Sequence, residues 1–90
     1  MIAYLKGQFV NISPASVQVE VNGVGYDVQI SLHTYSRIQH LDQGILYTSL
    51  LIREDAHTLY GFFEQSEKEM FQLLLGVSGI GASTARVILS

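Results

Sequence analysis

The 90-residue sequence lacks cysteine altogether. Neither a disulfide framework nor a thiolate metal site is therefore available to it. Long apolar runs are also missing, because the longest clusters, near residues 50–52 and 73–75, are far shorter than a membrane-spanning helix. No basic segment followed by a long apolar run begins at Met1, so we expect no secretory signal and no membrane association. A cytoplasmic location is the simplest expectation.

Basic residues are scarce. Five lysines and arginines stand against eight aspartates and glutamates, and the formal net charge is −3. Proteins that bind nucleic acid through bulk charge normally carry a basic surface, so any such affinity must come from other donors here. Apolar residues make up 48% of the chain, which is enough for a small core, and a chain of this size gains stability from oligomerisation.

Recognisable catalytic and metal-binding motifs are missing as well. His33, His40 and His57 lack the spacing of metal ligands and have no cysteine partners, so we expect no metal site. No serine has the context of a nucleophile elbow, and there is no Walker-type phosphate-binding loop. Glu54 and Asp55 are adjacent, but neighbours in an extended chain point to opposite sides and make a poor acid–base pair. The sequence therefore contains no recognisable catalytic motif, metal site or ATP-binding loop of its own.

The first 63 residues have the patterning of a small β-domain. Val17, Val19 and Val21 alternate with polar residues, as in a half-buried strand. Asn22-Gly23 follows, a pair that accepts positive φ in a tight hairpin turn, and a return strand is predicted at residues 26–30. Further strands are predicted at residues 2–6, 8–12, 45–52 and 59–63, with a loop or short helix at residues 34–41. Five or six short strands at this spacing favour a closed or nearly closed barrel.

From residue 64 the repeat of apolar residues changes from every second residue to about every 3.6 residues. This change predicts a helical segment over residues 64–90 and an α+β fold for the chain. Ser66 and Glu69 have the spacing of a capping box, and the first helix is expected to end around Gly76 and Gly79. A second helix begins after Gly81 and the sequence stops inside it, so we expect a fragment. The apolar residues predicted to be buried are Met70, Phe71, Leu73, Leu74 and Val77 in the first helix and Ala85, Ile88 and Leu89 in the second.

The turn between these helices, Val77-Ser78-Gly79-Ile80-Gly81, resembles a helix–hairpin–helix element. Glycines permit a tight turn and let the backbone approach a phosphate without an intervening Cβ. The first amides of the next helix lack intrahelical partners and carry partial positive charge, which suits the same phosphate. Ile80 is expected to pack between the helices, and Ala85 to let them approach closely. An ordinary turn between two helices fits this pattern equally well.

Five motifs occur in one order and at one spacing along the chain. They are residues 1–7, Val21-Asn22-Gly23-Val24-Gly25-Tyr26, Arg53-Glu54-Asp55-Ala56, Leu59-Tyr60-Gly61-Phe62 and Gly79-Ile80-Gly81. As a set they resemble the RuvA family, the Holliday-junction-binding subunits of a bacterial branch-migration motor, over essentially the whole chain. The resemblance implies an OB-like β-barrel domain at residues 1–63. Residues 64–90 would begin a helical domain, with only the first of its two helix–hairpin–helix elements.

The resemblance also implies a non-catalytic function in DNA recombination and repair, including the SOS response to DNA damage. Family members form homotetramers that hold four-way DNA junctions, and their partners are the RuvB ATPase and the RuvC resolvase. Contacts with DNA phosphates are implied for Gly79, Ile80, Gly81, Ala82 and Ser83. The junction centre is implied for Arg53, Glu54 and Asp55.

In that family role, the two carboxylates repel phosphates and keep the DNA strands apart, while Arg53 contacts a phosphate. No cofactor is implied, apart from a monovalent cation at the hairpin turn. The family commonly carries Pro-Lys where this chain has Ala82-Ser83. Because an ammonium group normally adds charge-assisted attraction, we expect weaker phosphate binding here.

Two other functions remain open. The barrel alone could bind single-stranded nucleic acid by stacking bases on exposed aromatic side chains, although few basic residues are near them. A helix–hairpin–helix enzyme such as a base-excision glycosylase would need a catalytic lysine or aspartate beyond the hairpin, where the sequence stops. The tyrosines available for stacking are Tyr4, Tyr26, Tyr35, Tyr47 and Tyr60, and core packing is the more common use of such alternating aromatics.

Overall fold

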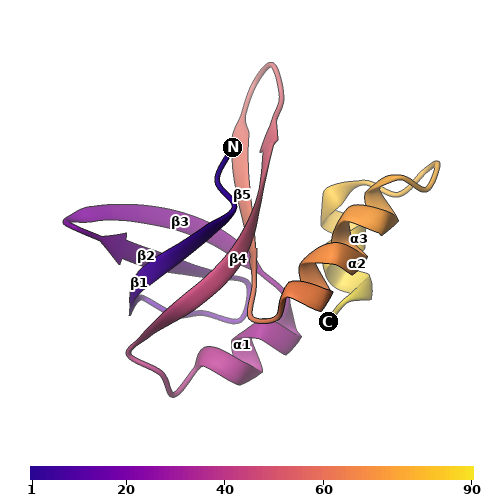
Figure 1. Ribbon diagram of the computed structural model, residues 1–90. Coiled ribbons are helices and arrows are strands. Elements are labelled where there is room, and N and C mark those ends of the chain that lie inside the picture. Colours follow the sequence, from indigo (N-terminus) through magenta and orange to yellow (C-terminus); the bar gives the residue numbers. More distant parts are fainter.

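Five strands close into a barrel in the computed structural model, which describes residues 1–90 (Figure 1). The strands are β1 (Tyr4–Val10), β2 (Ser16–Val21), β3 (Val24–Ile30), β4 (Gln43–Ile52) and β5 (His57–Phe62). Their order around the barrel is β1-β2-β3-β5-β4, and every neighbouring pair is antiparallel except β3 and β5. Helix α1 (Leu32–Ile38) connects β3 to β4. This arrangement is consistent with the predicted OB-like barrel.

The hairpin between β2 and β3 forms as the sequence predicts. Val21 pairs with Val24, and the two residues between them, Asn22 and Gly23, have φ values of 50° and 85°. Positive φ at both central positions gives the turn a twist that matches the flanking strands. The prediction of this turn is confirmed.

Strand β1 differs from the expectation. Residues 4–10 form one strand, whereas the sequence suggested two strands separated at Gly7. Gly7 lies inside the ladder opposite Gly44, and a Cβ built on it would lie only 2.3 Å from the Glu20 carbonyl oxygen. Glycine therefore allows a close approach of β1 and β2 at this point instead of ending the strand.

The barrel interior holds one continuous hydrophobic core. Its members come from all five strands and α1. Burying a large apolar side chain contributes about 1.5–3 kcal/mol, so this cluster is the main stabilising feature of the barrel. The nine buried residues are Leu5, Phe9, Val17, Val19, Val28, Ile30, Ile38, Leu46 and Leu59.

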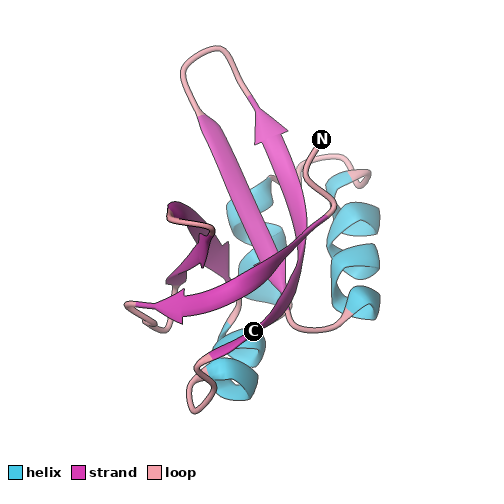
Figure 2. Ribbon diagram, turned by 60° about the vertical axis from the view of Figure 1, so that its left-hand side comes forward, coloured by secondary structure: helices cyan, strands magenta, loops and turns pink.

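Strand β5 is buried on both faces, which explains how the helices attach. Leu59 points into the barrel core, whereas Tyr60 and Phe62 point outward, as alternation along a strand requires. Helices α2 (Gln65–Leu75) and α3 (Ala82–Ile88) cover that outward face. Figure 2 shows the tip of the β4–β5 hairpin standing clear of the helices.

Two sequence predictions about the helical segment are wrong: the capping box at the start of α2 and part of the buried face. Helix α2 begins at Gln65 with Glu64 as its N-cap and has no side-chain cap, so Ser66 lies inside the helix and the predicted capping box does not form. The stripe of α2 that packs on the barrel runs through Glu67 and Phe71, with Leu74 partly buried. The side chains that were predicted to be buried but lie exposed are Met70, Leu73, Val77 and Ile88.

Candidate functional site

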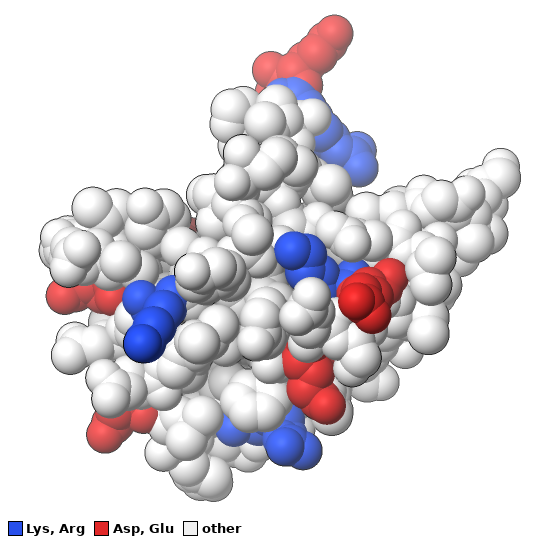
Figure 3. Space-filling view, viewed as in Figure 1, with Lys and Arg blue, Asp and Glu red and all other residues white.

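The β4–β5 loop carries the predicted junction-centre residues beyond the barrel. It closes with a backbone hydrogen bond from the Arg53 N–H to the Ala56 carbonyl, at 2.8 Å. The side chains of Arg53, Glu54 and Asp55 are exposed at its tip and form the isolated group of charges at the top of Figure 3. Neither carboxylate has an ion-pair partner in the chain. Their charges are therefore free to act on a ligand.

The turn between α2 and α3 exposes backbone amides at the start of α3. Gly81 is the N-cap of α3 in extended conformation and offers no side-chain cap, so the first amides of the helix have no side-chain acceptor. Within the turn, the Ile80 N–H donates to the Val77 carbonyl at 3.1 Å. Figure 3 shows this projection, at the right of the molecule, free of charged side chains. The residues of the turn itself can therefore attract an anion only through amides and hydroxyl groups.

The backbone conformation of the turn requires glycine at position 79 but not at position 81. Gly79 has a φ of +84°, in the left-handed region that glycine adopts most readily, so the turn itself requires a glycine there. Gly81 has a φ of −89°, which any residue adopts. A Cβ built on Gly81 would meet nothing within 4 Å. The fold therefore does not require glycine at position 81, and the open space beside its backbone is accessible from outside.

Ile80 and Ala85, at the α2–α3 turn and in α3, pack as the sequence predicts. Ile80 is partly buried against the cluster that joins the helices to β5, and Ala85 is fully buried in it. Ala82 is also buried, with 5% of its surface exposed, whereas Ser83 is exposed. Of Ala82 and Ser83, only Ser83 therefore presents its side chain to solvent.

One cavity joins the two predicted sites. Its volume is about 280 Å³, and it lies between the loop end of the β4–β5 hairpin and the first turn of α3. The sequence had assigned Arg53 and the glycine turn to separate places, but both line this cavity, while Glu54 and Asp55 remain outside it. Its lining residues are Leu51, Arg53, Thr58, Tyr60, Gly81, Ala82, Ser83 and Thr84.

The lining of this cavity is rich in hydrogen-bond donors. The guanidinium of Arg53 provides a permanent positive charge, and the hydroxyl-bearing residues of the lining are Thr58, Tyr60, Ser83 and Thr84. Sequence reasoning missed Thr58 and Thr84. A signal for Thr58 was present, because it lies two residues before Tyr60 and so shares the β5 face that meets the helices. An anion with several oxygen acceptors matches this set of donors.

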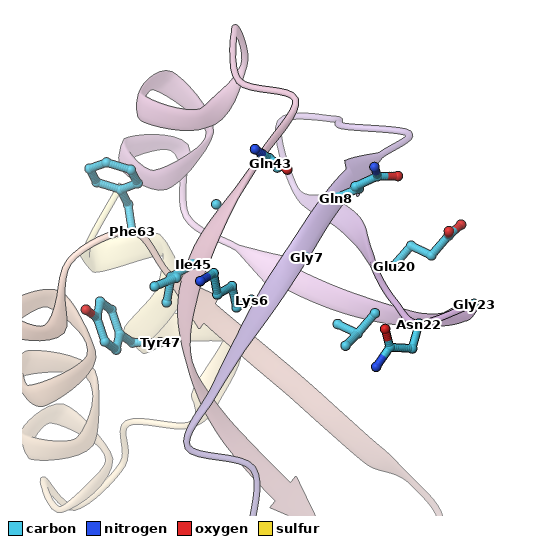
Figure 4. Close-up of a pocket in the computed structure, with 12 residues that line it drawn as sticks. Lys6, Gly7, Gln8, Glu20, Asn22, Gly23, Gln43, Ile45, Tyr47 and Phe63 are labelled. Atoms are coloured by element: carbon cyan, nitrogen blue, oxygen red, sulfur yellow. The ribbon is translucent and has the colours of Figure 1, made fainter.

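A second, larger groove crosses the outer face of β1 and β4 (Figure 4). It has a volume of about 850 Å³, and Figure 4 shows the Tyr47 and Phe63 rings on one side and Glu20 on the β2–β3 hairpin on the other. Lys6 is the single cation among its lining residues. Of the other tyrosines proposed for stacking, Tyr60 is buried in the cluster under the helices. The stacking surface is therefore narrower than the count of tyrosines suggests.

No group of three or more His, Asp or Glu side chains lies close enough together to hold a metal ion. None of the three helices combines the length and apolar character that crossing a bilayer would require. The monovalent cation at the hairpin turn remains a prediction.

Comparison with known sequences places the chain in a family. Residues 1–61 match the family described as RuvA N terminal domain. Proteins named "Holliday junction branch migration complex subunit RuvA" are 56% identical in Flavobacterium psychrophilum, 53% in Christiangramia forsetii and 53% in Bacteroides fragilis, each over the whole chain. The chain spans just under half the length of these relatives, at 47%, 47% and 45%. With more than half of its residues matched by that family, and with a closed five-stranded barrel, the chain belongs to the RuvA N-terminal domain family.

Proposed function

We propose that this chain binds four-way DNA junctions as part of the non-catalytic DNA-binding subunit of a branch-migration complex. The observation that carries the proposal is the cavity in which Arg53 of the barrel loop meets Gly81, Ser83 and Thr84 of α3. Donors from two parts of the chain converge there, next to a loop with two unpaired carboxylates. Sites for attraction and for repulsion of phosphate thus lie on one side of the molecule.

In this proposal the cavity holds one backbone phosphate of the junction. Arg53 supplies a charge-assisted hydrogen bond, and the hydroxyl groups of Ser83 and Thr84 and the first amides of α3 supply the others. The open space at Gly81 lets the phosphate approach the backbone. Gly79 and Ile80 shape and anchor the turn, and Ala82 packs beneath it. Because Ser83 replaces the family's lysine, each contact at the turn is weaker than in most relatives.

The carboxylates of Glu54 and Asp55 act by repulsion at the centre of the junction. With Arg53, they give the loop a net charge of −1, from one positive and two negative groups. Two unit charges 4 Å apart interact by about 1 kcal/mol in water, so two carboxylates facing strand backbones outweigh one guanidinium. The loop therefore keeps strands separated where they exchange partners, and no bond is cleaved.

The relatives' names describe a subunit of a branch migration complex. The wider assembly follows from the family resemblance: a homotetramer would present four such surfaces to four DNA arms, and a separate ATPase, RuvB, would drive migration, with RuvC as the resolvase. These partners, the cytoplasmic location and the helix–hairpin–helix identity of α2 and α3 belong to the proposal.

A gel-shift competition tests the junction preference. A labelled four-way junction bound to this chain is challenged with unlabelled junction or with duplex of equal length. We expect the junction to compete at least tenfold better than the duplex. Equal competition by both would contradict the proposal.

The phosphate contact is tested by Gly81→Val, with Gly25→Val as the matched control. The two sites are matched, because a Cβ added at either glycine meets no atom within 4 Å. We expect Gly81→Val to weaken junction binding about tenfold or more, because the added side chain occupies the space through which a phosphate approaches. Gly25→Val should leave binding unchanged. If the two substitutions changed junction affinity equally, Gly81 would not be part of the phosphate-binding site.

The double variant Glu54→Gln with Asp55→Asn tests repulsion. We expect it to retain or tighten junction binding while altering the separation of strands at the crossover, which fluorescent base analogues at the exchange point report. A large loss of affinity would show that the carboxylates bind rather than repel.

A second candidate function rests on the β1–β4 groove. Lys6, Tyr47 and Phe63 there could hold single-stranded nucleic acid through one ion pair and base stacking. Tyr47→Ala should then weaken binding of a single-stranded oligonucleotide, whereas Gly81→Val should not. The junction proposal predicts the opposite ranking.

A further inference from the structure

A buried carboxylate joins the helices to the barrel. Glu67, in the first turn of α2, is 8% exposed. Its Oε2 accepts a hydrogen bond from the Ser31 hydroxyl at 2.5 Å, and its Oε1 accepts one from the Thr34 hydroxyl at 2.7 Å. Both donors belong to the start of α1, more than thirty positions earlier in the chain. No basic side chain takes part.

Each of the two hydroxyl groups already accepts a backbone hydrogen bond. The Thr34 N–H donates to the Ser31 Oγ at 3.1 Å, and the Phe63 N–H donates to the Thr34 Oγ1 at 3.1 Å. Chains of hydrogen bonds that point the same way polarise and strengthen one another, and both chains here end on Glu67. The protein contains no buried side-chain N or O atom without a partner. The network is therefore complete only when residue 67 accepts on both of its terminal atoms.

A neutral amide cannot replace this carboxylate. The side chain of glutamine has one acceptor oxygen and a donor NH₂ group, so one of the two hydroxyl hydrogens would face another donor. Leaving a buried polar group without a partner costs more than the hydrogen bond contributes in net terms. The network thus selects glutamate at this position.

The hydrogen-bond network of Glu67 lies at one end of α2, so it influences where the other end of the helix lies. It fixes the first turn of α2, whereas the glycine turn lies beyond the last turn of the same helix (Figure 1). An 11-residue helix is about 16 Å long, so a tilt of about 10° at its base moves the far end by about 3 Å. Among the other polar links of these helices, the Leu32 N–H to the Ser90 hydroxyl and Lys68 to the Ala3 carbonyl are exposed to solvent. The bond from Arg86 to the Gln29 side-chain oxygen is partly buried, but it ties α3 to the barrel and not the base of α2.

We propose that Glu67 is a positioning residue that holds the α2–α3 turn at a fixed distance from the β4–β5 hairpin. It keeps Arg53 and Ser83 on opposite walls of one cavity. This inference rests on the proposed function for its consequence in DNA binding, but the positional effect itself is measurable without DNA.

The positional effect is tested with Glu67→Gln and its matched control Glu69→Gln. Both variants remove one carboxylate from α2, but Glu69 is exposed and has no hydrogen-bond partner. Because the chain has no native cysteine, spin labels go only where cysteines are introduced. The pair His57→Cys with Ser78→Cys reports the distance from β5 to the turn, and His57→Cys with Glu20→Cys reports a distance within the barrel.

We expect Glu67→Gln to shift or broaden the β5-to-turn distance by about 3 Å, in line with the helix length, while the barrel distance stays unchanged. Glu69→Gln should change neither distance. An unchanged β5-to-turn distribution in Glu67→Gln would overturn the proposal. If that variant does not fold, Thr34→Val removes one of the two hydroxyl donors at nearly constant volume and should give the same shift, whereas Thr34→Ser should restore the wild-type distance.

The consequence for binding is measured by the same junction competition. We expect Glu67→Gln to lower junction affinity about tenfold and Glu69→Gln to leave it unchanged. A shifted distance with unchanged junction affinity would overturn the inferred consequence of this positioning for DNA binding. If the wild-type chain shows no junction preference, the proposed function fails, yet the distance measurement still decides whether Glu67 positions the turn.

Discussion

The barrel and the α2–α3 hairpin are held together in different ways. The barrel encloses a core of nine buried residues, all from its own strands and α1. The hairpin has a cluster of five buried residues, and two of these, Tyr60 and Phe62, belong to β5. The helices therefore do not complete a core without the barrel. The position of the glycine turn therefore depends on β5, the same strand that leads out of the β4–β5 loop.

This difference sets an order of dependence between the two regions. Loss of the helices would uncover the outer face of β5 but would leave the barrel ladders and interior intact. Loss of the barrel would remove the surface on which the helices pack. The division of the chain into domains at residue 63 remains a prediction, and the first two substitutions below test whether the regions unfold separately.

Phe71→Ala should have the largest effect. Phe71 is fully buried, and its ring centroid lies 5.1 Å from that of Tyr60 and 4.9 Å from that of Phe62. Truncating a buried phenylalanine costs about 3–5 kcal/mol, because apolar contacts are lost and a cavity remains. We expect amide hydrogen exchange to show loss of protection in α2 and α3 while the β1–β4 ladder stays protected.

The matched control is Met70→Ala, one residue earlier on the exposed side of α2. Its effect on the free energy of unfolding should stay within about 0.5 kcal/mol. Simultaneous loss of protection in the barrel and the helices of Phe71→Ala would mean that the two regions unfold as one unit.

Gly7→Ala tests how far the stability of the barrel depends on the close approach of β1 and β2. The new Cβ would lie 2.3 Å from the Glu20 carbonyl oxygen, a backbone atom that cannot move aside without disturbing the β1–β2 pairing. We expect the free energy of unfolding to fall by about 1–3 kcal/mol, as overpacking usually produces. In contrast to Phe71→Ala, protection should fall in the barrel and in the helices together.

Gly25→Ala is the control for this change, because it adds the same methyl group in β3 where no atom lies within 4 Å. Denaturant titration should show Gly25→Ala close to the wild type. A wild-type midpoint for Gly7→Ala would show that β1 and β2 can separate without cost.

Much of the barrel could be predicted from the sequence, and the reason is local. Alternation around Val17 and Val19 and the Asn22-Gly23 turn depend on neighbouring residues, so period and turn chemistry suffice. The buried face of α2 could not be predicted in the same way. Tyr60 and Phe62 look like further barrel residues, and nothing local shows that the outer face of β5 is the surface that selects Phe71 over Met70 and Leu73.

In the candidate site, too, local motifs could be predicted from the sequence, whereas contacts between distant segments could not. The glycine turn and the charged loop were found as separate motifs, because each is a short segment with its own pattern. Their meeting at one cavity depends on how α3 packs against β5, which is a contact between distant segments. The Glu67 network was missed for this reason too, since Ser31 is 36 residues away and the Ser66–Glu69 spacing suggested a different cap.

Arg86→Met should have a smaller effect on the attachment of α3. The guanidinium Nη1 donates to the Ala15 carbonyl at 3.1 Å and to the Gln29 side-chain oxygen at 3.3 Å, which ties α3 to the barrel. Methionine keeps much of the apolar stem but no donor, so we expect a loss of about 1 kcal/mol. Arg53→Met makes the same change in the exposed loop and should leave stability unchanged. Thermal unfolding of both variants provides the measurement, and equal midpoints would show that Arg86 does not anchor α3.

Glu64→Gln should have the smallest effect, and one that depends on pH. The hydrogen bond between the Glu64 carboxylate and the His33 imidazole, at 2.8 Å, is the main cause that holds the pKa of Glu64 below its ordinary value of 4.5, and the charges of His33 and Arg37 add to it. A carboxyl group whose pKa is lowered by folding stabilises the folded state above its unfolded pKa and loses that effect as the pH falls through the folded pKa.

The melting temperature of the wild type should therefore exceed that of Glu64→Gln slightly at about pH 6, and the difference should shrink as the pH falls below 4.5 and through the lowered pKa of Glu64. Added salt should reduce the difference, because both side chains are exposed to solvent, at 41% and 45% of their surface. Glu69→Gln serves as the control on the same helix and should show no such pH dependence. A difference that grows on acidification would mean that the α1–α2 contact favours protonated Glu64. The contact would then weaken the attachment of the helices at neutral pH instead of supporting it.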